Sequence, residues 1–191
     1  MAKRVAKFEK VSFDQFGEDW FDTFKDIPEL CRMEYIIDTY AKLQLPTRAT
    51  KFSAGYDFKS PLPFTLQPNE TIKIPTGIRC SMNTDWVLKL YPRSSLGFKY
   101  RIRLENSTGI VDSDYFYSDN EGHIFIKITN CGEKTCSVNA GDGFAQGVFV
   151  EYGITEDDDV KISRNGGIGS TDDKKEWYLW NIKMQHFIFV I

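Results

Sequence analysis

Histidines and paired cysteines are scarce in this sequence. Its 191 residues include two histidines and four cysteines, and no two cysteines form a CxxC pair. A structural zinc site draws on closely spaced thiolates and imidazoles, so we expect reduced, mostly buried thiols at Cys31, Cys80, Cys131 and Cys136 instead. The formal net charge of −3 provides no broad basic field. We therefore expect no nucleic-acid partner, and local cations around any anionic ligand.

Long apolar runs are missing as well. The opening MAKRVAKFEKVSFDQF has no apolar stretch after its charges, unlike a signal peptide. The apolar segment EWYLWNIKMQHFIFVI (176–191) is too short and too mixed to cross a bilayer. We therefore expect a cytoplasmic protein without membrane contact. Its 41% apolar and 27% charged residues suit one ordinary globular domain, with room for an appendage.

The middle of the chain, residues 41–154, has the pattern of an all-β domain. Three segments alternate apolar and polar residues and a fourth is mostly apolar: TIKIP (71–75), WVLKLY (86–91), HIFIKIT (123–129) and FAQGVFVEY (144–152). In the third segment we expect Ile124, Ile126 and Ile128 on one face. Turn-forming clusters separate the segments, which favours a sandwich or barrel. No long helical pattern interrupts them, so a doubly wound α/β fold is disfavoured.

Residues 1–40 have helical periodicity instead. In SFDQFGEDWFDTF (12–24), aromatic residues recur at helical spacing after Ser12, which is placed as an N-cap. The segment ELCRMEYIIDTY (29–40) predicts a second short helix. Its expected apolar face consists of Leu30, Met33, Ile37 and Tyr40. Amphipathic stripes usually mean packing, so we expect this extension to lie on its own domain; docking of a partner is the alternative.

Residues 155–191 predict a third region. TEDDDV (155–160) is typical of a solvated acidic linker. SRNGGIGSTDDKK (163–175) is rich in glycine and polar residues and predicts a flexible arm. The apolar tail (176–191) could be an added strand or an interface element, and the sequence assigns it no function.

Five stretches could carry chemistry, because each combines glycine or serine with charge. They are SAGYDF (53–58), PRSSLGFK (92–99), NSTGIVDSDY (106–115), GDGFAQG (141–147) and RNGGIGST (164–171). Arg93 followed by two serines suits a phosphate group. Asp112 and Asp114 would point to opposite faces of a strand, which argues against a shared proton. A single carboxylate beside a water and a phosphate chain could act as a general base. Each stretch alone also fits an ordinary surface turn.

In order and spacing, these five stretches resemble the five motifs of the trimeric dUTPases, over about residues 42–171. The resemblance implies an all-β jelly roll, also described as a clip barrel, in a homotrimer with shared active sites. It implies hydrolysis of dUTP to dUMP and pyrophosphate, with Mg²⁺ on the triphosphate. Such an enzyme limits uracil incorporation into DNA and supplies dUMP for dTMP synthesis.

The same resemblance implies roles for individual residues. Asp112 would orient or deprotonate the attacking water, and Tyr115 would lie against the deoxyribose and exclude a 2′-hydroxyl. Asp57 would hold the metal indirectly, through water. The implied substrate-binding positions fall into four groups. Arg93, Ser94 and Ser95 would hold phosphates; Asn106, Gly109, Ile110, Val111 and Phe125 would surround the uracil; Gln146 would support the phosphate network; and Arg164, Ile168, Gly169, Ser170 and Thr171 would act from the arm.

The chain departs from the family pattern at several positions. Ile168 stands where the arm usually carries an aromatic residue, and Gly143 stands where an arginine is common. Two alternatives keep the nucleotide chemistry. A dCTP deaminase-type enzyme of the same superfamily would release ammonia, although GIVDSDY favours dUTP. A dUTPase-like regulatory protein would bind nucleotide and signal through residues 1–40. A generic β-sandwich binding module would make the order of the motifs a coincidence.

Overall fold

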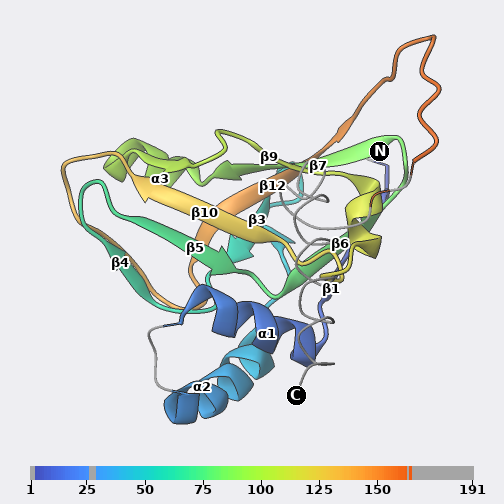
Figure 1. Ribbon diagram of the computed structural model, residues 1–191. Helices are drawn as coiled ribbons and strands as arrows, with labels where there is room; N and C mark the ends of the chain where they lie inside the picture. The colour runs from blue at the N-terminus through green and yellow to red at the C-terminus, as the bar shows by residue number, and fades with distance from the viewer. Residues whose placement is uncertain (1–2, 26–28, 163, 165–191) are drawn as a thin grey trace, which may run out of the picture.

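The computed structural model describes residues 3–25, 29–162 and 164, and short antiparallel strands dominate these residues (Figure 1). The largest sheet has the order β2, β3, β12, β7 and β9, with bounds Thr47–Arg48, Tyr56–Lys59, Gly143–Glu151, Trp86–Pro92 and Gly109–Val111. Strand β12 lies at its centre and pairs with β7 from Ala145 opposite Pro92 to Glu151 opposite Trp86. The predicted strands at 86–91 and 144–152 are therefore confirmed.

Three smaller sheets complete the strand body. Strands β5, β10 and β8 span Thr71–Pro75, Phe125–Asn130 and Ile102–Leu104; β4 and β11 span Phe64–Leu66 and Cys136–Val138; β1 and β6 span Ala6–Lys10 and Ile78–Met82. Ile124, Ile126 and Ile128 are all buried, as the alternation predicts, while Lys127 is exposed. They join one continuous core with residues of the largest sheet such as Phe58 and Leu88. The predicted all-β fold is confirmed.

The N-terminal helices cover one side of the strand body (Figure 1). Helix α1 spans Phe13–Thr23, and the hydroxyl of Ser12 caps it by accepting from the backbone N–H of Gln15. Helix α2 spans Glu29–Lys42. A second cluster buries Phe16, Trp20 and Ile36, with Leu62 of the strand body packed against it. The expectation that the aromatic face is buried on its own domain is confirmed.

The predicted apolar face of α2 is wrong for Met33 and Ile37, while the side chain of Leu30 lies outside the described residues. Met33 is 46% exposed and Ile37 is 53% exposed, whereas Ile36 is fully buried. The helix carries two overlapping stripes, and Tyr40 belongs to both. The stripe through Ile36, Tyr40 and Leu43 meets Phe16 of α1 in the second cluster. Periodicity alone does not say which of two adjacent stripes faces a neighbouring helix.

Strand β1 was not predicted. Its five residues, AKFEK, pair antiparallel with β6, with Phe8 opposite Cys80. The Phe8 ring also contacts Tyr56, Phe58 and Phe149 of the largest sheet. The segment before the helices is thus fixed to the strand body by backbone pairing as well as by side-chain contact.

Two short helical turns follow strand ends. Helix α3 spans Ser94–Tyr100 after β7, and the 3₁₀ helix η1 spans Ser113–Tyr117 after β9. The expected linker, residues 155–160, is exposed and lies outside any helix or strand. Among the helices that the structure describes, none has the length and apolar character needed to cross a membrane.

Candidate functional site

One group of predicted residues meets in an open pocket on the largest sheet. The pocket has a volume of about 220 Å³ and is lined by Ala49, Ser53, Gly55, Asp57, Arg93, Ser94, Ser95 and Gln146. Asp57 and Gln146 lie opposite each other on β3 and β12, and Arg93 directly follows β7. Sheet pairing therefore brings together the predicted phosphate and metal-water residues. We call this group the phosphate pocket.

The Arg93 guanidinium in the phosphate pocket is held by two contacts. Arg93 Nε lies 3.3 Å from Asp57 Oδ1, and its Nη1 donates to the Gly143 carbonyl at 3.3 Å. Glycine at position 143 makes room for this arrangement, because a Cβ there would lie 2.8 Å from Arg93 Nη1. A Cβ on Gly55 would likewise lie 2.6 Å from Gln146 Oε1. The departure from the family pattern at Gly143 thus leaves space for the Arg93 side chain.

A second group lies on the chain from β9 through η1 to the start of β10, residues 109–125. We call this segment the nucleoside hairpin, although its flanking strands β9 and β10 lie in different sheets. Asp112 follows the buried Val111 and precedes η1, and its side chain is 44% exposed. Tyr115 is only 6% exposed. Its hydroxyl donates to the His123 carbonyl at 2.7 Å and accepts from Asn120 Nδ2 at 2.9 Å. Burial raises the pKa of Tyr115, which keeps the hydroxyl protonated as a donor.

Asp112 and Asp114 do not point to opposite faces, so that prediction is wrong. The strand ends at Val111 and the chain turns into η1, which removes the two-residue alternation. One guanidinium reaches both carboxylates: Arg164 Nη2 lies 2.6 Å from Asp112 Oδ2, and Arg164 Nε lies 3.3 Å from Asp114 Oδ1. The same guanidinium lies 5.7 Å from the centre of the Tyr115 ring. The arm residue Arg164 is thus placed at the hairpin.

The other predicted residues are spread over neighbouring elements. Asn106 is exposed in the turn between β8 and β9, and Ile110 is 54% exposed. Gly109 pairs with Leu90, where an added Cβ would lie 3.0 Å from the leucine Cβ. Phe125 begins β10 and pairs with Pro75. The predicted arm positions Ile168, Gly169, Ser170 and Thr171 lie outside the described residues.

The two groups lie at opposite ends of strand β7. Strand β9 pairs with β7 in the register Val111 opposite Leu88, so Asp112 continues toward the beginning of β7. Arg93 follows its end. Five residues separate positions 88 and 93, which is roughly 17 Å at about 3.3 Å per residue. One copy of the chain therefore holds Asp112 and the phosphate pocket too far apart to contact the same phosphate group.

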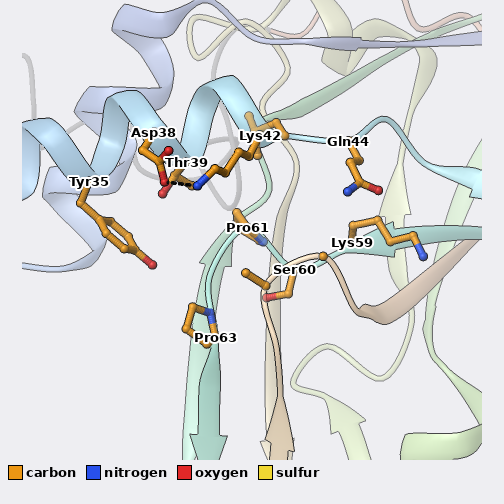
Figure 2. Close-up of a pocket in the computed structure, with 12 residues that line it drawn as sticks. Tyr35, Asp38, Thr39, Lys42, Gln44, Lys59, Ser60, Pro61 and Pro63 are labelled. Atoms are coloured by element: carbon orange, nitrogen blue, oxygen red, sulfur yellow. Dashed lines mark hydrogen bonds and ion pairs between the residues drawn. The ribbon is translucent and has the colours of Figure 1, made fainter.

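A larger cavity contains none of the predicted site residues. It has a volume of about 460 Å³ and lies between α2, the corner joining β3 to β4, and the turn before β12 (Figure 2). Lys42 on its rim is paired with Asp38 at 2.7 Å. Its walls include Tyr35, Pro61 and Pro63 (Figure 2). Among the described residues of the five motifs, only Gly141 of GDGFAQG lines this cavity.

The structure bears on possible metal ligands and on the state of the cysteines. No three His, Cys, Asp or Glu side chains cluster as a metal site anywhere in the described part of the chain. Cys80 and Cys136 are buried and Cys131 is partly buried, and all three are free thiols. Burial raises the pKa of Cys80 to about 12, so this thiol stays protonated. The side chain of Cys31 lies outside the described residues.

Sequence reasoning missed a set of contacts behind the nucleoside hairpin. His123, noted in the sequence only as one of two histidines, is fully buried and bonded to Asp19 of α1. Ser12, the N-cap residue of α1, donates hydrogen bonds to Glu121. These pairs join residues more than one hundred positions apart. No spacing pattern in the sequence indicates them.

Comparison with known proteins gives a consistent result. Residues 41–171 match the dUTPase family model. The deoxyuridine 5'-triphosphate nucleotidohydrolase of Lactococcus lactis subsp. lactis is 37% identical over 134 residues, covering 69% of this chain and 89% of the relative. The enzyme of the same name from Paraburkholderia xenovorans is 38% identical over 144 residues, covering 71% and 94%.

Solved structures include similar folds. The dUTPase from Streptococcus mutans is 36% identical with a TM-score of 0.53, and the match covers 59% of this chain and 88% of that chain. An Asp-to-Asn mutant dUTPase from phage phi11 of S. aureus is 26% identical with a TM-score of 0.51, covering 62% and 90%. The latter structure is described as coordinating a structural Mg(II) ion. The family match begins at residue 41, so α1 lies outside it.

Proposed function

The chain belongs to the dUTPase family, and from that premise we propose that it hydrolyses dUTP to dUMP and pyrophosphate. The observation that carries this proposal is the partly exposed carboxylate of Asp112, paired with Arg164, whose guanidinium also lies 5.7 Å from the centre of the buried Tyr115 ring. The activity would limit uracil incorporation into DNA and supply dUMP for dTMP synthesis. The cytoplasm remains the predicted location.

In this mechanism Asp112 orients the attacking water and accepts its proton. Water attack on the α-phosphorus needs in-line positioning and stabilisation of negative charge more than a strong nucleophile. Arg93 supplies the positive charge, with Ser94 and Ser95 beside it in the phosphate pocket. Tyr115 presents its ring to the deoxyribose, and the backbone near Ile110, Val111 and Phe125 reads the uracil edge. Arg164 and the remaining arm residues close over the triphosphate.

The residues of the phosphate pocket fit Mg²⁺ bound mainly through its substrate. Asp57 and Gln146 offer oxygen atoms on adjacent strands, and oxygen is the ligand that Mg²⁺ prefers. Asp57 is paired with Arg93 at 3.3 Å, which suits a contact through water better than direct coordination. When bound, the ion would neutralise charge on the triphosphate oxygens. The described residues hold no carboxylate cluster that would bind it without substrate.

We propose further that the working form is a homotrimer with shared active sites. The roughly 17 Å along β7 that separates the end of β9 from Arg93 of the same chain, at about 3.3 Å per strand residue, supports this. A second copy could bring its phosphate pocket to the hairpin of the first. A closed ring of three copies would repeat that contact at every interface.

Product analysis tests the proposed reaction. Pyrophosphate and ammonia would be measured from dUTP, dCTP, dTTP and UTP, with and without Mg²⁺. We expect pyrophosphate from dUTP alone and stronger turnover with the ion. Ammonia from dCTP would assign the chain to the deaminase-type alternative. Tight dUTP binding without any product would support the regulatory alternative instead.

Subunit mixing tests the shared site. Asp112→Asn and Arg93→Ala chains, each much less active than wild type when assayed alone at a dUTP concentration below KM, would be unfolded, mixed and refolded together. If each site takes these two residues from different subunits, about a quarter of the sites in a random mixture regain both. Recovered activity in a species of trimeric mass supports the proposal. A monomeric mass in light scattering, or no recovery from a mixed trimer, contradicts it.

A further inference from the structure

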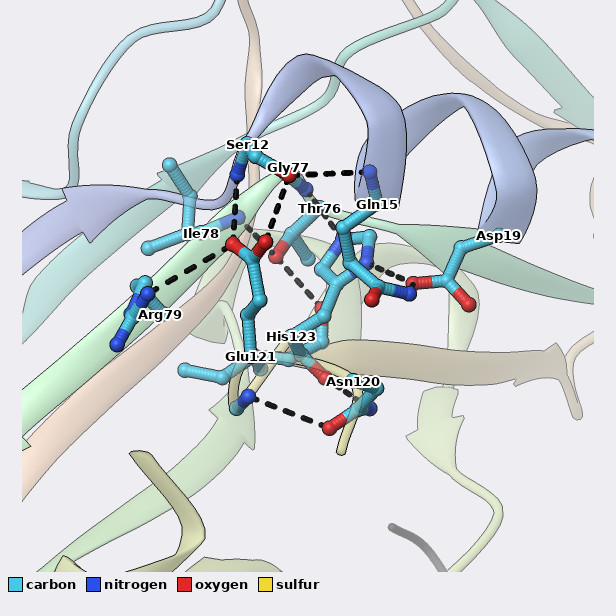
Figure 3. A network of polar contacts seen from close by, with 12 residues as sticks. Ser12, Gln15, Asp19, Thr76, Gly77, Ile78, Arg79, Asn120, Glu121 and His123 are labelled. Carbon is cyan, nitrogen blue, oxygen red and sulfur yellow. Dashed lines mark hydrogen bonds and ion pairs between the residues drawn. The ribbon is translucent and has the colours of Figure 1, made fainter. Parts of the chain in front are cut away.

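His123 is fully buried, and both of its ring nitrogens are bonded (Figure 3). The backbone N–H of Gly77 donates to Nε2 at 2.7 Å. An N–H group can only donate, so Nε2 carries no proton in this bond. The proton of the neutral imidazole is therefore on Nδ1, which donates to Asp19 Oδ2 at 2.5 Å. The carboxylate fixes both the tautomer and the orientation of the ring.

Helix α1 is attached to the nucleoside hairpin at a second point. Glu121 accepts from the backbone N–H and the hydroxyl of Ser12, both at 2.7 Å. Arg79 Nη1 lies 3.6 Å from the same carboxylate (Figure 3). Gln15 Nε2 donates to Asp19 Oδ2 at 2.9 Å and so helps to hold that carboxylate. Residues 121 and 123 are thus both fixed to the N-terminal extension.

His123 also touches both parts of the hairpin that would contact the nucleoside. Its carbonyl accepts from the Tyr115 hydroxyl at 2.7 Å. Its ring centre lies 4.7 Å from that of Phe125. A displaced His123 would therefore move the tyrosine predicted to lie against the sugar and the strand predicted to read the base.

We propose that Asp19 is a positioning residue that sets the preference for deoxyribose over ribose. It acts through His123 on the placement of Tyr115, and this inference rests on the proposed function. Excluding a single 2′-hydroxyl depends on close placement of the aromatic ring, and displacements on the order of 1 Å have large kinetic effects. The residue lies outside the matched family region, 41–171. The N-terminal extension would thus take part in substrate selection.

The first test compares two acidic residues of the same helix. Asp19→Ala removes the partner of His123, while Glu18→Ala removes an exposed carboxylate next to it. We expect Asp19→Ala to lower the ratio of kcat/KM for dUTP over UTP by about five- to tenfold, the effect of losing one hydrogen bond. Glu18→Ala should leave the ratio unchanged. Asp19→Asn should fall between wild type and Asp19→Ala, because its amide oxygen still accepts from Nδ1.

A merely structural role for Asp19 predicts a different outcome. The melting temperature would then fall while the sugar ratio of the folded fraction stayed at the wild-type value, and this result would overturn the inference. If Asp19→Ala does not fold, Asp19→Asn replaces it. A lowered ratio in that variant supports the proposal, and an unchanged ratio contradicts it.

A double-mutant cycle tests whether Asp19 acts through Tyr115. Tyr115→Phe removes only the hydroxyl that donates to His123. Two residues in one network give non-additive effects. We therefore expect the ratio of Asp19→Ala/Tyr115→Phe to be close to that of the more affected single variant. Full addition of the two effects would mean independent action and would overturn the proposal.

Binding measurements separate this inference from the proposed function. The α,β-imido analogues of dUTP and UTP report the sugar preference without turnover, as the ratio of their Kd values. A wild-type protein that prefers the dUTP analogue but releases no pyrophosphate would contradict the proposed reaction, while Asp19→Ala could still confirm the positioning role. A wild-type protein that binds neither analogue would overturn both.

Discussion

The phosphate pocket and the nucleoside hairpin are held in place by different kinds of structure. Asp57, Arg93 and Gln146 stand on or next to three neighbouring strands, so the register of the largest sheet places them. Tyr115 lies in the 3₁₀ helix η1 and His123 in the loop after it, and the side chain of Asp19 in α1 holds this segment. Backbone pairing thus positions one region. The helices α1 and α2, which we call the N-terminal layer, position the other.

This difference indicates which changes should affect which property. Substitutions in the phosphate pocket should weaken the binding of every nucleoside triphosphate to the same degree. Substitutions in the N-terminal layer should act on stability and on the choice of sugar. Asp112 belongs to the hairpin by position, but its proposed role is chemical.

The largest effect is expected at Asp112. Asp112→Asn should lower kcat by about 10²–10⁴-fold, the usual contribution of a general base, while the Kd of the α,β-imido analogue of dUTP changes little. Asp114→Asn is the matched control, since Arg164 contacts both carboxylates. Its kcat should stay within about fivefold of wild type, because exposed ion pairs contribute about 0–1 kcal/mol. Equal losses in both variants would contradict the assignment of the base.

Adjacent isoleucines of α2 test the N-terminal layer. Ile36 is fully buried and Ile37 is 53% exposed. Ile36→Ala should lower the free energy of unfolding by about 2–5 kcal/mol through lost burial and a cavity. Ile37→Ala should change it by about 0.5 kcal/mol or less. Denaturant titration measures both. Similar losses would show that the other stripe of α2 also packs on the domain in solution.

Arg93 tests the phosphate pocket. Arg93→Ala should raise KM for dUTP by about 10–100-fold, since hydrogen bonds to charged groups contribute about 1.5–3 kcal/mol. KM for UTP should rise by the same factor, leaving the sugar ratio intact. Its partly exposed pair with Asp57 should make the loss of stability smaller than about 1 kcal/mol. Lys99→Ala removes an exposed cation of α3 and serves as the control. A changed sugar ratio in Arg93→Ala would remove the distinction between the two regions.

The smallest effect concerns pH. The hydrogen bond from the Ser12 hydroxyl lowers the pKa of Glu121 below its usual 4.5. This carboxylate therefore contributes stability above that value, and the contribution is lost as pH falls through the lowered pKa. Between about pH 5 and about pH 3, the melting temperature should fall more steeply for wild type than for Glu121→Gln. The exposed Glu133→Gln should follow wild type, and parallel curves for all three proteins would contradict the prediction.

Four strands of the body, β5, β7, β10 and β12, could be predicted because their signals are local. The alternation of Ile124, Ile126 and Ile128 gives the buried face of one segment directly, and the order of five motifs gives the family. The cap at Ser12 follows from neighbouring residues in the same way. The alternation and the cap depend on residues close together in sequence, and each of the five motifs is itself short.

The errors and omissions involve choices between distant partners. The face of α2 depends on where α1 lies, and the sequence offers two stripes of similar character. The orientation of Asp114 depends on the strand ending at Val111, and propensity locates such ends poorly. Asp19 and His123 are 104 positions apart in the sequence, and neither residue alone differs from ordinary helix or loop composition.

The bonds of the His123 ring also provide a way to sort the relatives of this chain. Gly77 has a φ of +73°, and a Cβ there would lie 2.3 Å from Leu43 Cδ1, so this position has little freedom to vary. The imidazole at 123 gains its second partner only if a carboxylate reaches it from the N-terminal side. Histidine and an upstream acid should therefore be inherited together or lost together. That two-residue signature would distinguish members whose hairpin is held by N-terminal helices from members whose hairpin is supported in another way.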